Sequence, residues 1–160
     1  MTSFETSPRA IASVVEFSIS VDSSEIARVS TWLGEAGSAR GVPPEPLWRL
    51  DLCVTEALAN VIDHGGMTTG SRPISLRLNV HRGESGCNAS VIVSDAGTEF
   101  NPLTAPLRPQ ARTLAEAMPG GQGLTLLRRF ADALEYSYGE AQNHLTIQVR
   151  WSREKDGLPR

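Results

Sequence analysis

Three polar side chains recur at every fourth position in the stretch LDLCVTEALANVIDHGG, residues 50–66. They are Glu56, Asn60 and His64, and four-residue spacing stacks side chains on one face of a helix. A carboxylate, a carboxamide and an imidazole in register form either a solvated helix face, where such residues mostly lie, or one wall of a polar site. Two motifs further along the chain favour the second interpretation.

Both of these motifs place glycine next to the end of a predicted element. Asp95 and Gly97 stand in DAG at the end of a predicted strand, where glycine permits a sharp turn or the close approach of a ligand. GGQG, residues 120–123, precedes a predicted helix, and the backbone N–H groups of a helix N-terminus bind anions. GGQG alone is also typical of a flexible loop end. The three features together predict one polar site that includes an anion-binding helix start.

Alternating apolar residues predict the strands that position these motifs. Residues 13–20 alternate Val15, Phe17 and Ile19 with polar neighbours, and residues 72–82 alternate in the same way. Residues 88–97 predict a third strand, joined to the second by the glycine-containing turn GESGC. Residues 135–151 predict a final hairpin-like pair of strands.

Three helices are predicted between the strands. Asp22 and Glu25 form a capping-box pattern at the start of the first, which then carries an apolar stripe. The second helix follows VPPEP and contains Glu56, Asn60 and His64, which we call the polar row. It ends at HGG, where glycine can adopt the left-handed conformation. The third is QGLTLLRRFADAL, residues 122–134, with Leu124 and Leu127 on one stripe.

Strands and helices are grouped along the chain rather than strictly alternating. This order predicts an α+β fold: a two-layer α/β sandwich with a mostly antiparallel mixed sheet and helices on one face. We expect one domain over residues 13–151, a flexible N-terminal arm over residues 1–12 and a C-terminal tail over residues 152–160. The long loop over residues 98–120 is rich in proline, and loops of that length are usually functional or disordered.

Composition excludes several classes of protein. The chain has 160 residues and a net charge of −3, which argues against a dedicated nucleic-acid binder because phosphate binding needs clustered cations. No apolar run reaches the roughly 18 residues of a membrane-spanning helix, and the N-terminus lacks the apolar region of a secretory signal. Cys53 and Cys87 form no C-x-x-C pair, which predicts free thiols in a reducing cytoplasm.

In combination the motifs resemble the boxes of the Bergerat-fold (GHKL) ATPases, and within them the bacterial anti-sigma factor serine/threonine kinases. EALANVIDH, residues 56–64, is similar to their asparagine box E-A-x-x-N-x-x-x-H. DAGTEFNP, residues 95–102, is similar to their first glycine box D-x-G-x-x-F-D-P. GGQGLTLLRRFADALEY is similar to their second, G-x-G-L-x-L-x-x-x-x-x-D. The resemblance runs over residues 13–151 and implies the histidine-kinase-like ATPase fold.

The resemblance also implies ATP and Mg²⁺ as cofactors and a role for each matching residue. Glu56 would be the general base, and Asn60 would bind Mg²⁺ through its carboxamide oxygen, the type of ligand that this ion prefers. Asp95 would accept a hydrogen bond from the adenine amino group, and Gly97 would let the base pack closely. The remaining expected nucleotide contacts are Gly121, Gly123, Leu124 and Thr146.

Residues 98–120 would form the ATP lid, which folds over the nucleotide and opens again. Three features depart from the family pattern. Asn101 stands where the family often has Asp, Gln122 stands where many relatives carry Arg, and PLRPQ replaces part of a compact lid. These departures concern the lid and nucleotide affinity rather than the fold.

The function implied by the resemblance is that of an ATP-dependent protein serine/threonine kinase. It would phosphorylate an anti-anti-sigma protein and, when free, sequester a sigma factor, acting as a cytoplasmic homodimer without direct nucleic-acid or membrane binding. The alternative is a non-catalytic nucleotide-binding module that only docks partners; Glu56 favours the enzyme, because a pure binder needs no base. A histidine kinase is less favoured, because residues 1–12 leave no room for a dimerising helix with a phosphoacceptor His.

Overall fold

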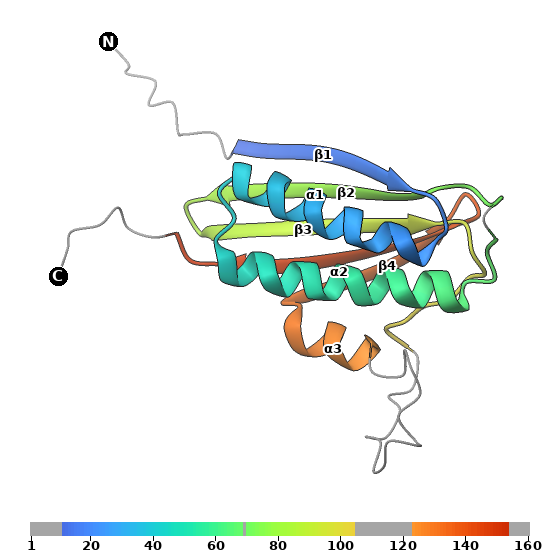
Figure 1. The fold of residues 1–160 in the computed structure, drawn as a ribbon. Helices are drawn as coiled ribbons and strands as arrows, with labels where there is room; N and C mark the ends of the chain where they lie inside the picture. Colours follow the sequence, from blue (N-terminus) through green and yellow to red (C-terminus); the bar gives the residue numbers. More distant parts are fainter. Residues whose placement is uncertain (1–10, 69, 105–122, 154–160) are drawn as a thin grey trace, which may run out of the picture.

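The computed structural model describes residues 11–68, 70–104 and 123–153. Five strands form one sheet in the order β1-β2-β3-β5-β4, and all four pairings are antiparallel (Figure 1). The strands are β1 (Ile11–Ile19), β2 (Ile74–Gly83), β3 (Gly86–Asp95), β4 (Ala133–Gly139) and β5 (Gln142–Trp151). The helices are α1 (Ile26–Ala39), α2 (Pro44–His64) and α3 (Gly123–Phe130). The predicted α+β sandwich is confirmed, without a parallel pair among the described strands.

The two faces of the sheet differ in composition because side chains alternate along each strand. One face carries the buried apolar residues and lies against α1 and α2 (Figure 1). Its central strands contribute Leu76, Leu78, Val91, Val93, Ile147 and Val149. The other face is polar and has no helix over it among the described residues (Figure 1). Any site built from the polar row of α2 therefore lies on the helical side of the sheet.

The start of α1 uses half of the predicted capping box. Asp22 accepts a hydrogen bond from the N–H of Ser24 at 2.9 Å, as a capping residue does. Glu25 does not bond back to the N–H of Asp22; its carboxylate pairs instead with Arg28 at 2.6 Å. A short 3₁₀ turn, Ser23–Glu25, therefore precedes the helix.

Both ends of α2 follow from its sequence. Pro44 occupies the first helical position, where its missing N–H costs no hydrogen bond. Gly65 closes the helix, and Gly66 adopts a φ of +67°, the left-handed conformation predicted for this glycine pair. Cys53 is buried in the middle of α2, and burial raises the pKa of its thiol to about 11. Cys53 and Cys87 are both free thiols, as predicted.

The third helix is shorter than predicted, because it ends at Phe130 and β4 begins at Ala133. The backbone leaves the helix where the N–H of Asp132 bonds to the carbonyl of Gln148 at 2.8 Å. The guanidinium of Arg49, on α2, donates to the carbonyl of Phe130 and to the Asp132 carboxylate, each at 3.0 Å. Contacts distant in sequence thus override the helical pattern of FADAL.

Asp132 is expected to make its full contribution to stability only above about pH 4, the ordinary pKa of its carboxyl group. Burial would raise the pKa of its carboxyl, but hydrogen bonds from the Arg150 N–H and from Arg49 outweigh burial and lower it. A carboxyl with a lowered pKa stabilises the fold above its unfolded value and loses that contribution as pH falls through the folded value. Asp132→Asn should cost about 1 kcal/mol of unfolding free energy at pH 7, since the side chain is over a third exposed.

Urea unfolding of both proteins across pH measures this difference. It should be constant from about pH 5 to 7 and shrink below about pH 3.5. Glu45→Gln, which removes the more exposed partner of the same guanidinium, is the matched control and should change stability less. A difference that persists at pH 2.5 would show that Asp132 acts through shape rather than charge.

Candidate active site

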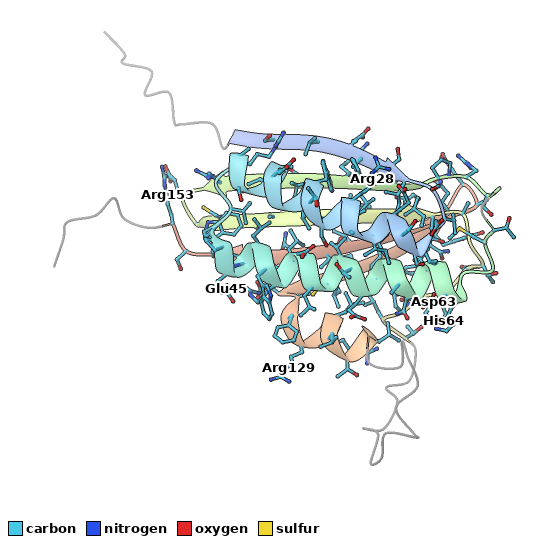
Figure 2. The ribbon with its side chains drawn as sticks, in the orientation of Figure 1. Arg28, Glu45, Asp63, His64, Arg129 and Arg153 are labelled. Carbon is cyan, nitrogen blue, oxygen red and sulfur yellow. The ribbon has the colours of Figure 1, made fainter. Side chains whose placement is uncertain are left out.

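The polar row lies on the side of α2 that faces α3. Arg49 marks this side, because it stands seven residues before Glu56 and bonds to the carbonyl of Phe130 at the end of α3. Glu56 and Asn60 are half-buried, and neither makes a hydrogen bond or ion pair with any residue that the structure describes. His64 is exposed at the last residue of α2, at the opposite end from Glu45 (Figure 2). The side chains of Glu56 and Asn60 are thus available for a ligand.

Asp95 ends β3 on the same side of the sheet, as it continues the inward alternation of Val91 and Val93. Its side chain is only 5% exposed. One carboxylate oxygen, Oδ1, accepts hydrogen bonds from the Gly97 N–H at 2.9 Å and from Asn143 Nδ2 at 3.1 Å. The other oxygen, Oδ2, accepts none from the described residues. Oδ2 is therefore the carboxylate oxygen that remains able to accept a hydrogen bond from a ligand.

Gly97 brings the end of β3 against the end of α2. A Cβ at this position would lie 2.7 Å from the carbonyl oxygen of Gly65 and 2.9 Å from Asp95 Oδ1. The neighbouring Thr98 N–H bonds to the same Gly65 carbonyl at 3.1 Å. The chain's own packing therefore demands glycine here, in addition to any approach of a base.

Gly97→Ala is expected to lower the thermal unfolding midpoint. The added methyl group would overlap the backbone of Gly65, and overpacking of this kind costs about 1–3 kcal/mol. At this chain length, that corresponds to roughly 2–12 °C, measurable by calorimetry. Gly34→Ala in α1 is the matched control, because a Cβ there meets nothing within 4 Å, so helix propensity should leave it neutral or stabilising. Equal midpoints for the two variants would contradict the predicted clash.

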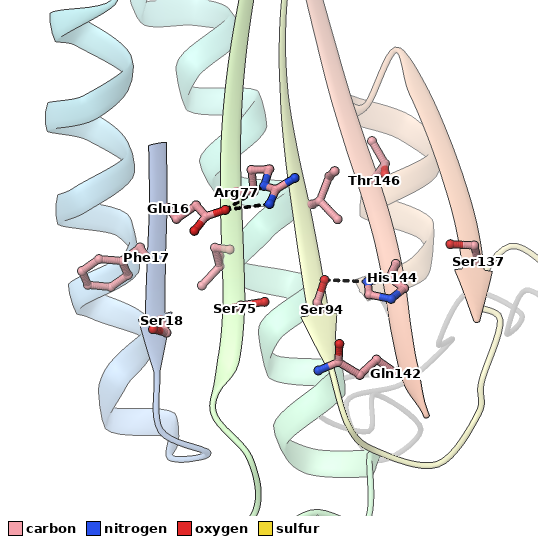
Figure 3. A pocket seen from close by; sticks show the side chains of 12 residues that line it. Glu16, Phe17, Ser18, Ser75, Arg77, Ser94, Ser137, Gln142, His144 and Thr146 are labelled. Carbon is pink, nitrogen blue, oxygen red and sulfur yellow. Dashed lines mark hydrogen bonds and ion pairs between the residues drawn. The ribbon is translucent and has the colours of Figure 1, made fainter. Parts of the chain in front are cut away.

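The structure corrects the placement of Thr146. Asp95 pairs with Asn143 and Ile92 pairs with Thr146, so Thr146 stands three residues from Asn143 and points to the opposite face. There it lines an open hollow of about 750 Å³ on the polar face (Figure 3). Thr146 therefore cannot contact a ligand that Asp95 binds. Asn143 occupies the position beside Asp95 instead.

The hollow on the polar face holds one close pair of reactive side chains. Ser94 Oγ and His144 Nδ1 lie 2.7 Å apart (Figure 3). A serine nucleophile with a histidine base needs a third group to orient the histidine. Among the described residues that line the hollow, Glu16 is the one with a carboxylate, and it pairs with Arg77 at 2.7 Å rather than with His144. The Ser94–His144 pair is therefore a weaker candidate for a catalytic site than the residues around Glu56, Asn60 and Asp95.

Only some of the nucleotide contacts that the sequence predicted around α3 can be located in the structure. Gly123 is its first residue, which agrees with the predicted helix start, while Gly121 lies outside the described residues. Leu124 is half-buried and packs against the apolar core. Most of the expected lid, residues 105–120, also lies outside the described part of the chain.

The first part of that loop is described and is attached to α3. Arg128 Nη2 donates to the Leu103 carbonyl at 2.8 Å. Asn101 Oδ1 accepts the Leu103 N–H at 2.9 Å, a local turn that an aspartate at this position would also support. The loop after β3 thus starts from a fixed base.

Asn143 is the site residue that the sequence motifs did not reveal. It is 6% exposed and contacts Asp95, Gly97 and Thr98 through one amide group. Its signal is an asparagine in phase with the apolar positions of a strand, since Leu145 and Ile147 follow at two-residue spacing. A polar residue at a buried strand position needs partners, and finding them requires the register of β5 against β3.

Comparison of the sequence with known proteins identifies the family to which the chain belongs. Residues 19–149 match the sequence model of the protein family described as the histidine kinase-like ATPase domain. The serine/threonine-protein kinase BtrW of Bordetella bronchiseptica is 39% identical over 98 residues, which are 61% of this chain and 66% of that protein.

The fold also resembles a solved structure. The crystal structure of the RsbU and RsbW domains of Rv1364c from Mycobacterium tuberculosis is similar, with a TM-score of 0.61 and 18% identity. The likeness covers 88% of this chain and 33% of that one. In the described part of the chain, no helix has the length and apolar character needed to cross a membrane.

Proposed function

Because the chain belongs to the family of histidine kinase-like ATPase domains, we propose that it is an ATP-dependent protein serine/threonine kinase that phosphorylates an anti-anti-sigma protein. The similarity to BtrW, a serine/threonine-protein kinase, supports this activity. The observation that carries the proposal is the unpartnered, half-buried carboxylate of Glu56 on the side of α2 that faces α3. A module that only held nucleotide would not require a carboxylate at this place.

Asp95 fits the adenine end of ATP. Its Oδ1 is occupied by two donors from the chain, so Oδ2 is the atom left to accept a hydrogen bond. The exocyclic amino group of adenine is a donor, and a carboxylate accepts such a bond more strongly than a neutral group does. Gly97 keeps this end of the strand close to the C-terminal end of α2, where the polar row ends.

Asn60 and Glu56 fit the phosphate end. Within the described residues, no group of three or more His, Cys, Asp or Glu side chains could hold a metal ion. The Asn60 carboxamide oxygen would be the protein ligand of Mg²⁺, an ion that prefers oxygen ligands. When bound, ATP would supply the phosphoryl group and Mg²⁺ would neutralise the negative charge of the phosphates. Glu56, one helical turn before Asn60, would accept the proton of the partner's serine or threonine hydroxyl.

The same proposal includes the partners and assembly expected of an anti-sigma factor kinase. The free protein would bind a sigma factor as a homodimer in the cytoplasm, and phosphorylation of the anti-anti-sigma protein would set which partner is bound. The structural likeness to the RsbU and RsbW domains of Rv1364c supports the fold on which this proposal depends.

Transfer of label from γ-³²P-ATP tests the proposed activity. The full chain, Mg²⁺ and a candidate anti-anti-sigma protein are incubated together, and label should appear on a serine or threonine of that protein. Affinity capture of partners from the native cell with mass spectrometry would supply the candidate. Tight ATP binding without transfer to any captured partner would favour the non-catalytic docking module.

A further inference from the structure

Asn143 uses its whole carboxamide to join three segments of the site. Its Nδ2 donates to Asp95 Oδ1 at 3.1 Å and to the carbonyls of Gly97 and Thr98 at 3.3 and 3.0 Å. Its Oδ1 accepts the Phe100 N–H at 3.1 Å and the Tyr136 hydroxyl at 2.5 Å. Every hydrogen-bond partner of Nδ2 is an acceptor, and every hydrogen-bond partner of Oδ1 is a donor. The orientation of this amide is therefore fixed by its partners.

Three of these five bonds hold residues 97–100, the start of the loop that follows β3. The side chains of Thr98 and Phe100 are exposed, so the segment is attached through its backbone rather than by apolar burial. Phe100 has its backbone N–H on Asn143, whereas the Thr98 N–H is held independently by the Gly65 carbonyl. The base of the loop thus depends on the same amide that fixes the Asp95 carboxylate.

We propose that Asn143 is a positioning residue that couples purine binding at Asp95 to the base of the loop after β3. The proposal rests on the proposed function, because it takes a nucleotide as the ligand of Asp95 Oδ2. By holding Oδ1, Asn143 leaves Oδ2 as the acceptor for the purine amino group. By holding the Thr98 carbonyl and the Phe100 N–H, it links the strength of that contact to the position of the loop. Coupling between two such sites is reciprocal.

The coupling requires an amide and not merely a side chain of this size. Asn143→Asp keeps the shape but sets a carboxylate against Asp95 and two carbonyl oxygens, with no N–H to bridge them. Asn143→Ser removes the amide without adding charge, so it serves where the aspartate variant fails to fold. Tyr136→Phe removes one donor to Oδ1 and leaves all three bonds from Nδ2, which makes it the matched control.

Two measurements on each variant test the proposal: ATP affinity by calorimetry, and hydrogen exchange of the backbone amides of residues 97–100 with and without Mg-ATP. In the wild-type protein, ATP should slow exchange at Gly97 and Phe100. Asn143→Ser should weaken ATP binding about tenfold and abolish this slowing at Phe100, while the Thr98 amide stays protected. Asn143→Asp should weaken binding further, and Tyr136→Phe should change it less than about threefold.

The outcomes separate this proposal from the proposed function. Wild-type protein that does not bind ATP would overturn both. ATP binding with unchanged affinity in Asn143→Ser, or with equal Phe100 exchange in the presence and absence of nucleotide, would overturn the coupling and leave the kinase proposal standing. Loss of protection at Thr98 as well as Phe100 would show general unfolding of the loop base, and would also overturn a specific role for Asn143.

Discussion

Glu56→Gln is expected to reduce phosphoryl transfer by about 10²–10⁴-fold while ATP binding persists. Glutamine keeps the size of the side chain and removes the carboxylate that would take the proton, and that range is typical for loss of a general base. Glu56 makes no hydrogen bond or ion pair with the described residues, so its replacement should not disturb the fold. Single-turnover transfer from γ-³²P-ATP, beside calorimetric ATP affinity, measures the two effects separately.

Two further variants on the same helix complete that experiment. Asn60→Ala removes the proposed metal ligand, so Mg²⁺-dependent ATP binding and transfer should fall together. Asp63→Asn changes an exposed carboxylate near the end of α2 and should alter neither (Figure 2). Wild-type transfer by Glu56→Gln would remove Glu56 as the base. If Asn60→Ala also bound and turned over nucleotide normally, the polar row would be only a solvated helix face.

Asp95→Asn is expected to weaken ATP binding about 10- to 150-fold without unfolding the domain. The Gly97 N–H and Asn143 Nδ2 both donate to Oδ1, so the new carboxamide must keep its oxygen there. Its NH₂ group then replaces Oδ2 and sets a donor against the adenine amino group. Loss of one hydrogen bond to a charged group costs about 1.5–3 kcal/mol, which gives the stated range.

The same geometry predicts a change in base preference. Inosine triphosphate carries a carbonyl where ATP carries the amino group, so the carboxamide of Asp95→Asn should donate to it. The variant should prefer inosine triphosphate over ATP, whereas the wild-type protein prefers ATP. Calorimetric titration of both proteins with both nucleotides gives the ratio directly. Unchanged ATP affinity and an unchanged preference would place Asp95 outside the binding site.

The fold was largely predictable because its strands and helices have clear periods. Alternation in β2 and the glycine pair after α2 fixed which residues face the core and where the helix stops. The end of α3 was not predictable from local pattern, because Arg49 holds the carbonyl of Phe130 across 81 residues of chain. The start of β1 at Ile11 likewise depends on its pairing with Arg82 rather than on a local signal.

The site residues that lie within sequence motifs were predictable, whereas those placed by the pairing register of the strands were not. Glu56, Asn60 and Asp95 lie in contiguous motifs, and the structure leaves on each an atom without a partner from the described residues. Thr146 was placed wrongly because a shift of one or three residues along a strand reverses the face. Asn143 could not be predicted for the same reason, because its contact with Asp95 depends on the two residues being paired in the β3–β5 register.

A crystal structure of the protein with Mg²⁺ and a non-hydrolysable ATP analogue tests the central claim most directly. The adenine amino nitrogen should lie within about 3.2 Å of Asp95 Oδ2, and the ion about 2.1 Å from Asn60 Oδ1. The Glu56 carboxylate should face the terminal phosphate from the side of α2. A nucleotide bound instead in the hollow beside Ser94 and His144, or one that leaves Asp95 Oδ2 without a donor, would contradict the account.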